Sequence, residues 1–250
     1  MKVDLLLPTS LSEIPLSRYQ DFIAMKEKSN DEEFIAQKMI QIFCNIKLDK
    51  VGQIRLKDLN ELIDHFSKIF SEKPKLKNKF KIKNIEFGFI PKLDDITLGE
   101  YVDLENYLKS WETYHKAMAV MYRPITNAIG QKYLIQDYEP NEEMQKLMRN
   151  APLDVAISAS VFFWSLAKEL YSSLVNYLER ETKKMMDSTN TQNGINSPNI
   201  GDGIAVSMRS LKEILPSLTR LQQQDLLNVS PISHSKSKKT KLKQENLNKI

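Results

Sequence analysis

The side chains best suited to metal binding are scarce in this chain and widely spaced. There are three histidines, His65, His115 and His234, and the single cysteine is Cys44. A metal site needs several such ligands at helical or hairpin spacing, and no two of these lie close in sequence. Cys44 sits in the apolar run MIQIFCNI, so it has neither a CxxC partner nor a disulfide partner within one chain. We therefore predict no metal site, no cofactor and a reducing compartment.

Short motifs of enzymatic catalysis do not occur in the sequence. None of GxSxG, HExxH, GxxxxGKS or GxGxxG is found, and the seven glycines lie far apart, which argues against phosphate-cradling loops. The acidic pairs Asp94-Asp95 and Glu142-Glu143 are favourable charges near helix starts. We predict that the protein is not an enzyme and has no catalytic residues. An unrecognised hydrolase stays as an alternative, because the members of a catalytic triad need not be neighbours in sequence.

Positive charge is concentrated at the end of the chain. The formal net charge is +4, yet the last twenty residues hold six lysines against one glutamate, so the rest of the chain is close to neutral. The basic segment SHSKSKKTKLK is of a type that follows nucleic-acid backbones, but it has no aromatic residue to stack on bases. It is expected either to be a solvated tail or to make weak, salt-sensitive nucleic-acid contacts through Lys236, Lys238, Lys239, Lys241 and Lys243.

One phrase occurs twice and predicts two helix starts. LSEIPLSRYQDF begins at Leu11 and LDDITLGEYVDL begins at Leu93, with five identities in twelve positions. In the first copy, Pro15 permits a first helical turn but supplies no capping side chain. Three interpretations stay open: two unrelated amphipathic helices that each follow an extended segment, a duplicated strand-then-helix unit, or a ligand site built from the paired tyrosines Tyr19 and Tyr101.

The second copy carries the clearer helix signal. Thr97 is placed to cap the helix, and Glu100, three residues later, is placed to complete a capping box. The helical pattern continues through LKSWETYHKAMAVMY until Pro124 ends it. The apolar residues of the first turns then share one face of the helix: Leu98, Tyr101 and Leu104.

The remaining pattern predicts a mainly α (α+β) fold, a helical body with a small antiparallel sheet. An amphipathic helix is expected over 17–28. A second begins after a cap at Asn30 or Asp31, and a third covers 56–70. The alternation in KFKIKNIEFGF predicts a hairpin near 79–90, and the opening KVDLLLP predicts an N-terminal strand that joins it. KYLIQDY is typical of a further short strand. The opening apolar run is too short for the hydrophobic core of a signal peptide.

The longest helical segment runs from about Leu153 to Met186 and contains no glycine or proline. Its uncharged stretch, from Val155 to Ala167, is shorter than the roughly 18 residues that a membrane span requires. We therefore predict one long buried helix near 153–186, which completes a helical globular body formed by residues 1–186.

The composition of the chain changes after this helix. Residues 187–203 read as a polar linker, residues 204–227 as an amphipathic helix that Pro216 bends or splits, and residues 228–250 as a basic tail expected to be disordered. The amphipathic helix carries too many apolar side chains on one face for that face to stay in water, so the helix should dock on the body or on a partner protein. The predicted contact residues are Ile204, Met208, Leu211, Leu215 and Leu218.

Two stretches carry a resemblance to a known family. FGFIPKLDDITLGEYVDLENYLKSWETYHKAMAVMYRPI, followed by APLDVAISASVFFWSLAKEL, resembles an uncharacterised structural or assembly protein family of tailed bacteriophages, which includes crAss-like phages and marine relatives. The resemblance covers about residues 1–185 and includes no catalytic motif. It implies a virion or morphogenesis protein, located in the particle and, during assembly, in the host cytoplasm.

Together these observations predict a non-catalytic bacteriophage virion protein. It would be a neck or tail component, or cargo carried in the particle, and its partners would be other phage proteins of the neck, tail or portal region, with homo-oligomerisation left open. One alternative is a transient tail-assembly chaperone. A second alternative is a DNA-associated factor that uses the basic C-terminal tail.

Overall fold

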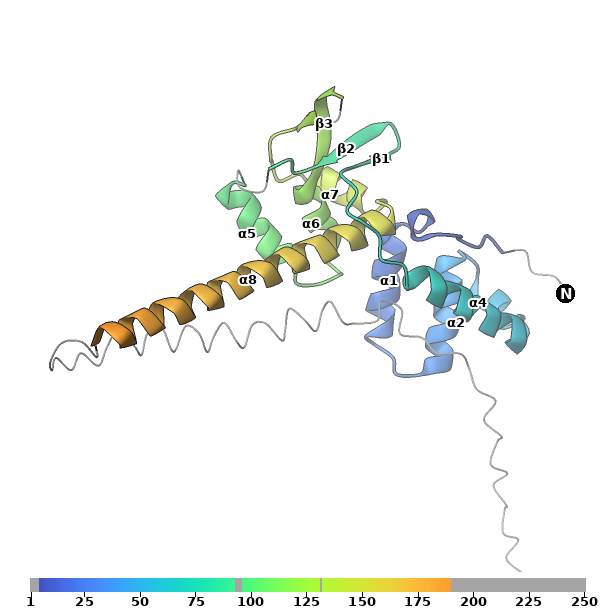
Figure 1. Cartoon of the computed structure of the whole chain (residues 1–250). Coiled ribbons are helices and arrows are strands. Elements are labelled where there is room, and N and C mark those ends of the chain that lie inside the picture. The colour runs from blue at the N-terminus through green and yellow to red at the C-terminus, as the bar shows by residue number, and fades with distance from the viewer. Residues whose placement is uncertain (1–4, 93–95, 131, 190–250) are drawn as a thin grey trace, which may run out of the picture.

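The protein has a mainly helical α+β fold, as the sequence predicts, with a small antiparallel sheet beside the helices (Figure 1). The computed structural model describes residues 5–92, 96–130 and 132–189; past Phe163 it describes the backbone and some of the side chains. A helical lobe and a sheet lobe meet at the start of one long helix, α8 (Leu153–Thr189). The hydrophobic core is continuous through both lobes.

The helical lobe is built from short helices that follow one another along the chain. They are η1 (Leu11–Glu13), α1 (Leu16–Lys26), α2 (Glu32–Phe43), α3 (Leu48–Val51) and α4 (Leu56–Phe70). Asp31, one of the two caps expected from the sequence, accepts two backbone hydrogen bonds at 3.0 and 3.1 Å at the start of α2. Phe43 lies at the centre of the lobe, with the ring centroids of Phe22, Phe66 and Phe70 within 5.4 Å.

The sheet lobe contains an antiparallel sheet with the strand order β1-β2-β3-β4. Its strands are β1 (Lys79–Ile82), β2 (Ile85–Phe89), β3 (Tyr122–Ile129) and β4 (Lys132–Ile135). β1 and β2 form the hairpin predicted from the alternation of apolar residues, and Lys83 turns it with a φ of 53°. β4 lies within the stretch KYLIQDY, where a further strand is expected.

The predicted N-terminal strand is wrong for the part of it that the structure describes. Residues 5–8 lie outside the strands, and β2 pairs with β3 instead. β3 begins where α6 (Tyr114–Met121) ends, so Pro124 lies in a strand just beyond the helix rather than in a loop. Proline has no N–H to donate, but the Pro124 carbonyl accepts a hydrogen bond from Gln136 N at 2.9 Å. The sheet therefore uses this proline only as an acceptor.

The remaining helices lie beside the sheet in Figure 1. They are α5 (Leu98–Tyr107), α6 and α7 (Glu142–Met148). The helical region expected after Thr97 is thus divided into α5 and α6, and the hydroxyl of Thr113 donates to Tyr107 O at 3.0 Å in the turn between them. α6 packs against both α5 and α7, and it leads directly into β3.

Helix α8 confirms the predicted long helix, and the buried side chains that the structure describes in it lie at its start. The side chains from Leu153 to Ser160 are buried, whereas Val161 is 40% exposed and Tyr177 is 60% exposed. Figure 1 shows the later turns of α8 extending away from the two lobes. The expectation of a buried core helix therefore holds for its first turns, whereas none of the side chains that the structure describes from Val161 onward is buried.

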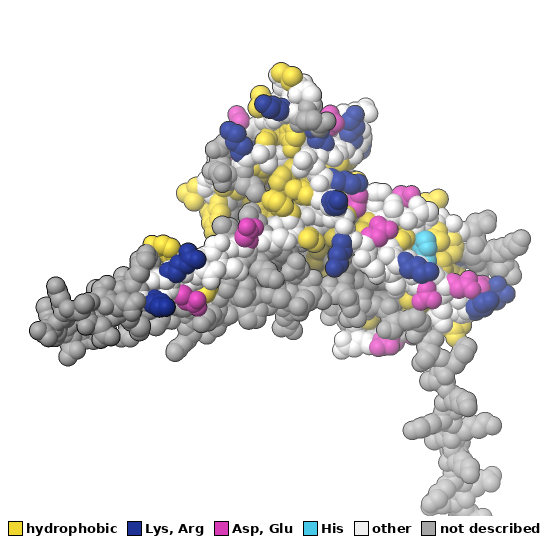
Figure 2. Space-filling model, in the orientation of Figure 1, with side chains coloured by type: hydrophobic (Ala, Val, Ile, Leu, Met, Phe, Trp, Pro, Cys, Tyr) yellow, Lys and Arg dark blue, Asp and Glu magenta, His cyan; other side chains and the backbone are white. Residues whose placement is uncertain are grey.

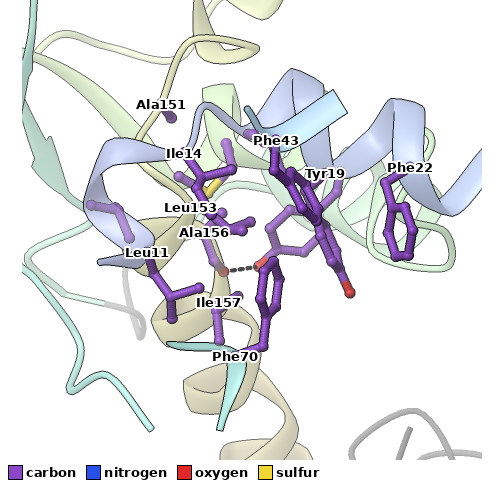
Figure 3. Packing of buried hydrophobic residues seen from close by; sticks show 14 of the residues in the cluster. Leu11, Ile14, Tyr19, Phe22, Phe43, Phe70, Ala151, Leu153, Ala156 and Ile157 are labelled. Carbon is purple, nitrogen blue, oxygen red and sulfur yellow. Dashed lines mark hydrogen bonds between the residues drawn. The ribbon is translucent and has the colours of Figure 1, made fainter. Parts of the chain in front are cut away.

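The starts of α1 and α8 are joined by a symmetric exchange of backbone hydrogen bonds. Ile14-Pro15-Leu16 lies antiparallel to Ala151-Pro152-Leu153, and we call this pair of segments the proline clip. Leu16 N donates to Ala151 O, and Leu153 N donates to Ile14 O, both at 2.9 Å. The first N–H groups of a helix have no partner within it, so each helix supplies an acceptor to the other. Apolar side chains from both segments, labelled in Figure 3, pack together around the clip.

Gly88 in β2 lies under the ring of Tyr133, and we predict that Gly88→Ala destabilises the fold. A Cβ there would lie 2.4 Å from Cε2 of Tyr133, whose hydroxyl donates to Phe89 O at 2.8 Å and so fixes the ring. We expect the free energy of unfolding, measured by urea denaturation, to fall by about 1–3 kcal/mol. The control Gly99→Ala, in α5, places its Cβ in open space and should gain about 0.5 kcal/mol. Equal stabilities would show that Tyr133 is not held over Gly88.

Candidate interaction surfaces

Helix α5 turns apolar side chains outward and an acidic side chain inward. Leu98 is 79% exposed, Tyr101 56% and Val102 45%, whereas Glu100 is only 3% exposed. Of the three residues expected to share one face, Leu98 and Tyr101 are therefore in solvent and only Leu104, 5% exposed, is in the core. A surface helix normally buries its apolar stripe. The first turn of α5 is the reverse of this rule, whereas Leu104, Tyr107 and Leu108 further along the helix pack in or against the core.

Two interactions of Glu100 fix this orientation. The predicted capping box is present: Oε2 of Glu100 accepts from Thr97 N and from Thr97 Oγ1, both at 2.7 Å, and Thr97 Oγ1 accepts from Glu100 N at 3.3 Å. The other carboxylate oxygen lies 2.7 Å from Nη2 of Arg123 on β3, in an ion pair whose side chains are 4% and 12% exposed. A buried charge without a partner is costly. The side of α5 that carries Glu100 and Leu104 therefore faces inward, and the side that carries Leu98, Tyr101 and Val102 faces solvent.

Arg123 also lines a small pocket between α6, β3 and α7. Its guanidinium carbon lies 5.9 Å from the centroid of the Tyr138 ring, and the Tyr138 hydroxyl donates to Asp103. Burial raises the pKa of Tyr138. The hydrogen bond to Asp103 and the negative charge of Asp103 raise this pKa further. The pocket has a volume of about 50 Å³, against roughly 300–1,000 Å³ for typical small-molecule sites. Its size suits a few ordered waters better than a cofactor or substrate.

The outer part of the sheet lobe carries further exposed apolar side chains. Ile129, at the end of β3, is 78% exposed, and Leu134, in β4, is 64% exposed. Figure 2 shows hydrophobic side chains over the sheet and α5 on this face of the molecule, with basic side chains between them. Exposed apolar residues that gather on one lobe are typical of a protein-contact surface. The sheet-lobe apolar set, as we call it, consists of Leu98, Tyr101, Val102, Ile129 and Leu134.

The two copies of the repeated phrase are used differently. In the first copy, Leu16 and Tyr19 are 0% and 1% exposed, and the Tyr19 ring lies 4.9 Å from that of Trp111 and 5.8 Å from that of Phe70. In the second copy, the corresponding leucine and tyrosine are the exposed residues of α5. The paired tyrosines have different surroundings, one in the core and one in solvent, which argues against a ligand site built from both.

The histidines and the cysteine that the structure describes have separate local roles. His65 Nε2 lies 2.8 Å from Pro8 O, and His115 Nδ1 lies 3.0 Å from Gln20 Nε2. Within residues 5–92, 96–130 and 132–189, no group of three or more His, Cys, Asp or Glu side chains could hold a metal ion. Burial raises the pKa of the Cys44 thiol to about 11, so this cysteine is almost entirely protonated, and a poor nucleophile, at neutral pH.

Two polar side chains that organise the interior carry no recognisable sequence signal. Gln20 is 6% exposed and donates to the backbone carbonyls of Trp111 and Glu112 at 2.6 and 3.1 Å, which ties α1 to the turn before α6. Arg123 lies one residue before Pro124, where the sequence indicates only the end of a helix. Their partners are distant in sequence, so periodicity and spacing do not reveal them.

The contact residues predicted from the sequence lie outside the described part of the chain. This applies to the amphipathic segment, with Ile204, Met208, Leu211, Leu215 and Leu218, and to the basic tail, with Lys236, Lys238, Lys239, Lys241 and Lys243. The linker 187–203 is described only in its first residues, which form the end of α8. These three predictions therefore stay predictions.

Comparison with known proteins gives no family. No protein-family model, no curated protein and no solved structure matches this chain. Among the helices that the structure describes, none has both the length and the apolar character needed to cross a membrane.

The buried ion pair of α5 can be tested with Glu100→Gln. Glutamine keeps the shape of the side chain and can still accept from Thr97, but it removes the charge that faces Arg123. We expect the free energy of unfolding to fall by about 3 kcal/mol in urea denaturation, because a buried arginine loses its counter-charge. The matched control Glu61→Gln breaks an exposed pair with Lys57 and should change it by less than about 0.5 kcal/mol. A change no larger than that of the control would mean that Arg123 is solvated.

The stability of the fold should also depend on the protonation of His115. Burial lowers the pKa of His115, and the positive charges of Arg149 and Lys116 lower it further. Below the unfolded-state pKa of about 6.5, the unfolded chain then binds more protons than the native protein, so stability falls as the pH decreases from 7 to 5. Thermal unfolding at several pH values should show a smaller loss for His115→Gln than for the wild type. A pH dependence of His115→Gln equal to that of the wild type would contradict this role.

Proposed function

We propose that this protein is a non-catalytic bacteriophage virion protein, a neck or tail structural component or cargo carried in the particle, that acts through contacts with other phage proteins. The observation that carries the proposal is the reversed orientation of the first turn of α5. Leu98, Tyr101 and Val102 are exposed on a helix that a buried ion pair and a capping box hold in place. Burying such side chains against a partner would contribute roughly 1.5–3 kcal/mol for each one fully covered.

The rest of the described surface is consistent with protein contacts rather than with catalysis. The pocket beside Arg123 is too small for an ordinary substrate, and two of the polar side chains that line it are engaged, Arg123 with Glu100 and Tyr138 with Asp103. The sheet-lobe apolar set, by contrast, is presented on a folded scaffold, so little conformational entropy would be lost on binding. The bacteriophage context of the proposal rests on the sequence resemblance over residues 1–185 alone. That context implies partners in the neck, tail or portal region, and a location in the virion and, during assembly, in the host cytoplasm.

The first test is quantitative mass spectrometry of purified phage particles. A virion protein should be present at a fixed copy number in every preparation, in proportion to the known structural proteins. Presence in infected-cell lysate but not in particles would overturn the virion assignment in favour of a transient tail-assembly chaperone. Absence of any association with phage proteins in either sample would overturn the proposal as a whole.

The second test asks whether α5 is the contact surface. We predict that Leu98→Asp lowers the copy number in particles by about tenfold or more, because a central apolar contact is worth at least about 1.4 kcal/mol. The matched control Ala24→Asp adds the same charge to an exposed position of α1 and should leave incorporation unchanged. Both variants should keep the wild-type circular dichroism spectrum. Equal incorporation of the two variants would place the contact elsewhere on the molecule.

A further inference from the structure

The second half of α8 has a polar side in solvent. Its described polar side chains are exposed, and six of them follow one another at spacings of four and three: Ser165, Glu169, Ser172, Asn176, Glu179 and Lys183. The sequence between them contains apolar residues, all but one of them large, also at spacings of three and four: Trp164, Ala167, Tyr171, Leu174 and Leu178. In an α-helix, two such series fall on different sides. The sequence of α8 therefore specifies a heptad stripe that needs a partner helix.

One segment of the same chain has the matching pattern. In residues 204–218, apolar residues recur at spacings of four, three, four and three: Ile204, Met208, Leu211, Leu215 and Leu218. We propose that this segment packs antiparallel along the apolar stripe of α8 in its own chain and closes a helical hairpin with it. The inference concerns an intramolecular contact, so it does not depend on the proposed function.

The lengths of the segments agree with this arrangement. At 1.5 Å per residue, the stripe from 164 to 178 and the stripe from 204 to 218 each span about 21 Å. α8 continues for about 16 Å beyond position 178 before it ends at Thr189. The chain must then return over that distance and move sideways by roughly 10 Å to reach a packed antiparallel helix. A polar connection of about 14 residues has a root-mean-square length of roughly 20 Å, which matches the required span.

Connection through this linker also favours the same chain over a second copy. A flexible tether of this length gives an effective concentration in the millimolar range, well above an ordinary protein concentration. Pro216 interrupts helical hydrogen bonding, so the regular part of the returning helix would be residues 204–215, with Leu218 beyond the bend. Four of the five apolar positions of the segment lie before this proline.

Hydrogen exchange of the full-length protein, read by mass spectrometry, tests the hairpin. We compare the wild type with the double variant Leu211→Asp/Leu215→Asp and with the control Ser210→Asp/Ser217→Asp, which adds the same charge off the stripe. In the wild type and the control, amides of residues 204–215 should exchange at least about tenfold more slowly than in the stripe variant. Unchanged exchange in α1 and α2 of both variants would show that the body stays folded.

The same samples are measured at two concentrations, with the molar mass determined by light scattering. Protection of 204–215 that persists on tenfold dilution of a monomer supports packing within one chain. Protection that disappears on dilution together with a dimeric mass overturns it in favour of a second copy. Equal exchange in the wild type and the stripe variant overturns it altogether, whether or not the protein enters phage particles.

Discussion

The backbone exchange of the proline clip is the constraint on which the arrangement of this protein depends. It joins the first residues of α1 to the first residues of α8 and gives buried N–H groups at both helix starts an acceptor. Leaving such groups unpaired would cost about 1–3 kcal/mol each. Because the clip fixes the start of α8 in the core, the sheet lobe can attach to the same turns: Tyr114 donates to Ala156 O at 3.1 Å, and Lys77 pairs with Asp154. The direction in which α8 leaves the body follows from these contacts.

The buried ion pair of Glu100, together with the burial of Leu104, decides the orientation of α5. Rotating the helix to cover Leu98 and Tyr101 would gain roughly 1.5–3 kcal/mol for each side chain fully buried. The same rotation would remove Glu100 from Arg123, and breaking a buried pair of this kind costs about 3–5 kcal/mol. The apolar side chains are therefore left in solvent, where a second protein can bury them without disturbing the ion pair.

The features that could be predicted from the sequence are those set by neighbouring residues. The cap at Asp31, the capping box of Thr97 and Glu100, and the hairpin turned at Lys83 each depend on a few adjacent positions. The orientation of α5 could not be predicted, because it depends on Arg123 in a different element, and strand β3 could not be predicted, because it pairs with β2, which is distant in sequence. The same limit applies to the N-terminal strand: KVDLLLP has the composition of a strand, but the place beside β2 is taken by β3. The candidate contact surface was missed because a helical wheel assumes that the apolar side is buried.

The two copies of the repeated phrase show how local capping is related to whether a helix start lies in the core or at the surface. Pro15 gives α1 no capping side chain, so the start of this helix takes its acceptor from Ala151 and must lie in the core. Thr97 and Glu100 cap α5 from within, so this helix needs no distant backbone at its start and can lie at the surface. A self-capped helix is held in one conformation before any partner arrives. Its exposed apolar residues would then bind with little loss of backbone entropy, which is the property that a contact surface in a large assembly requires.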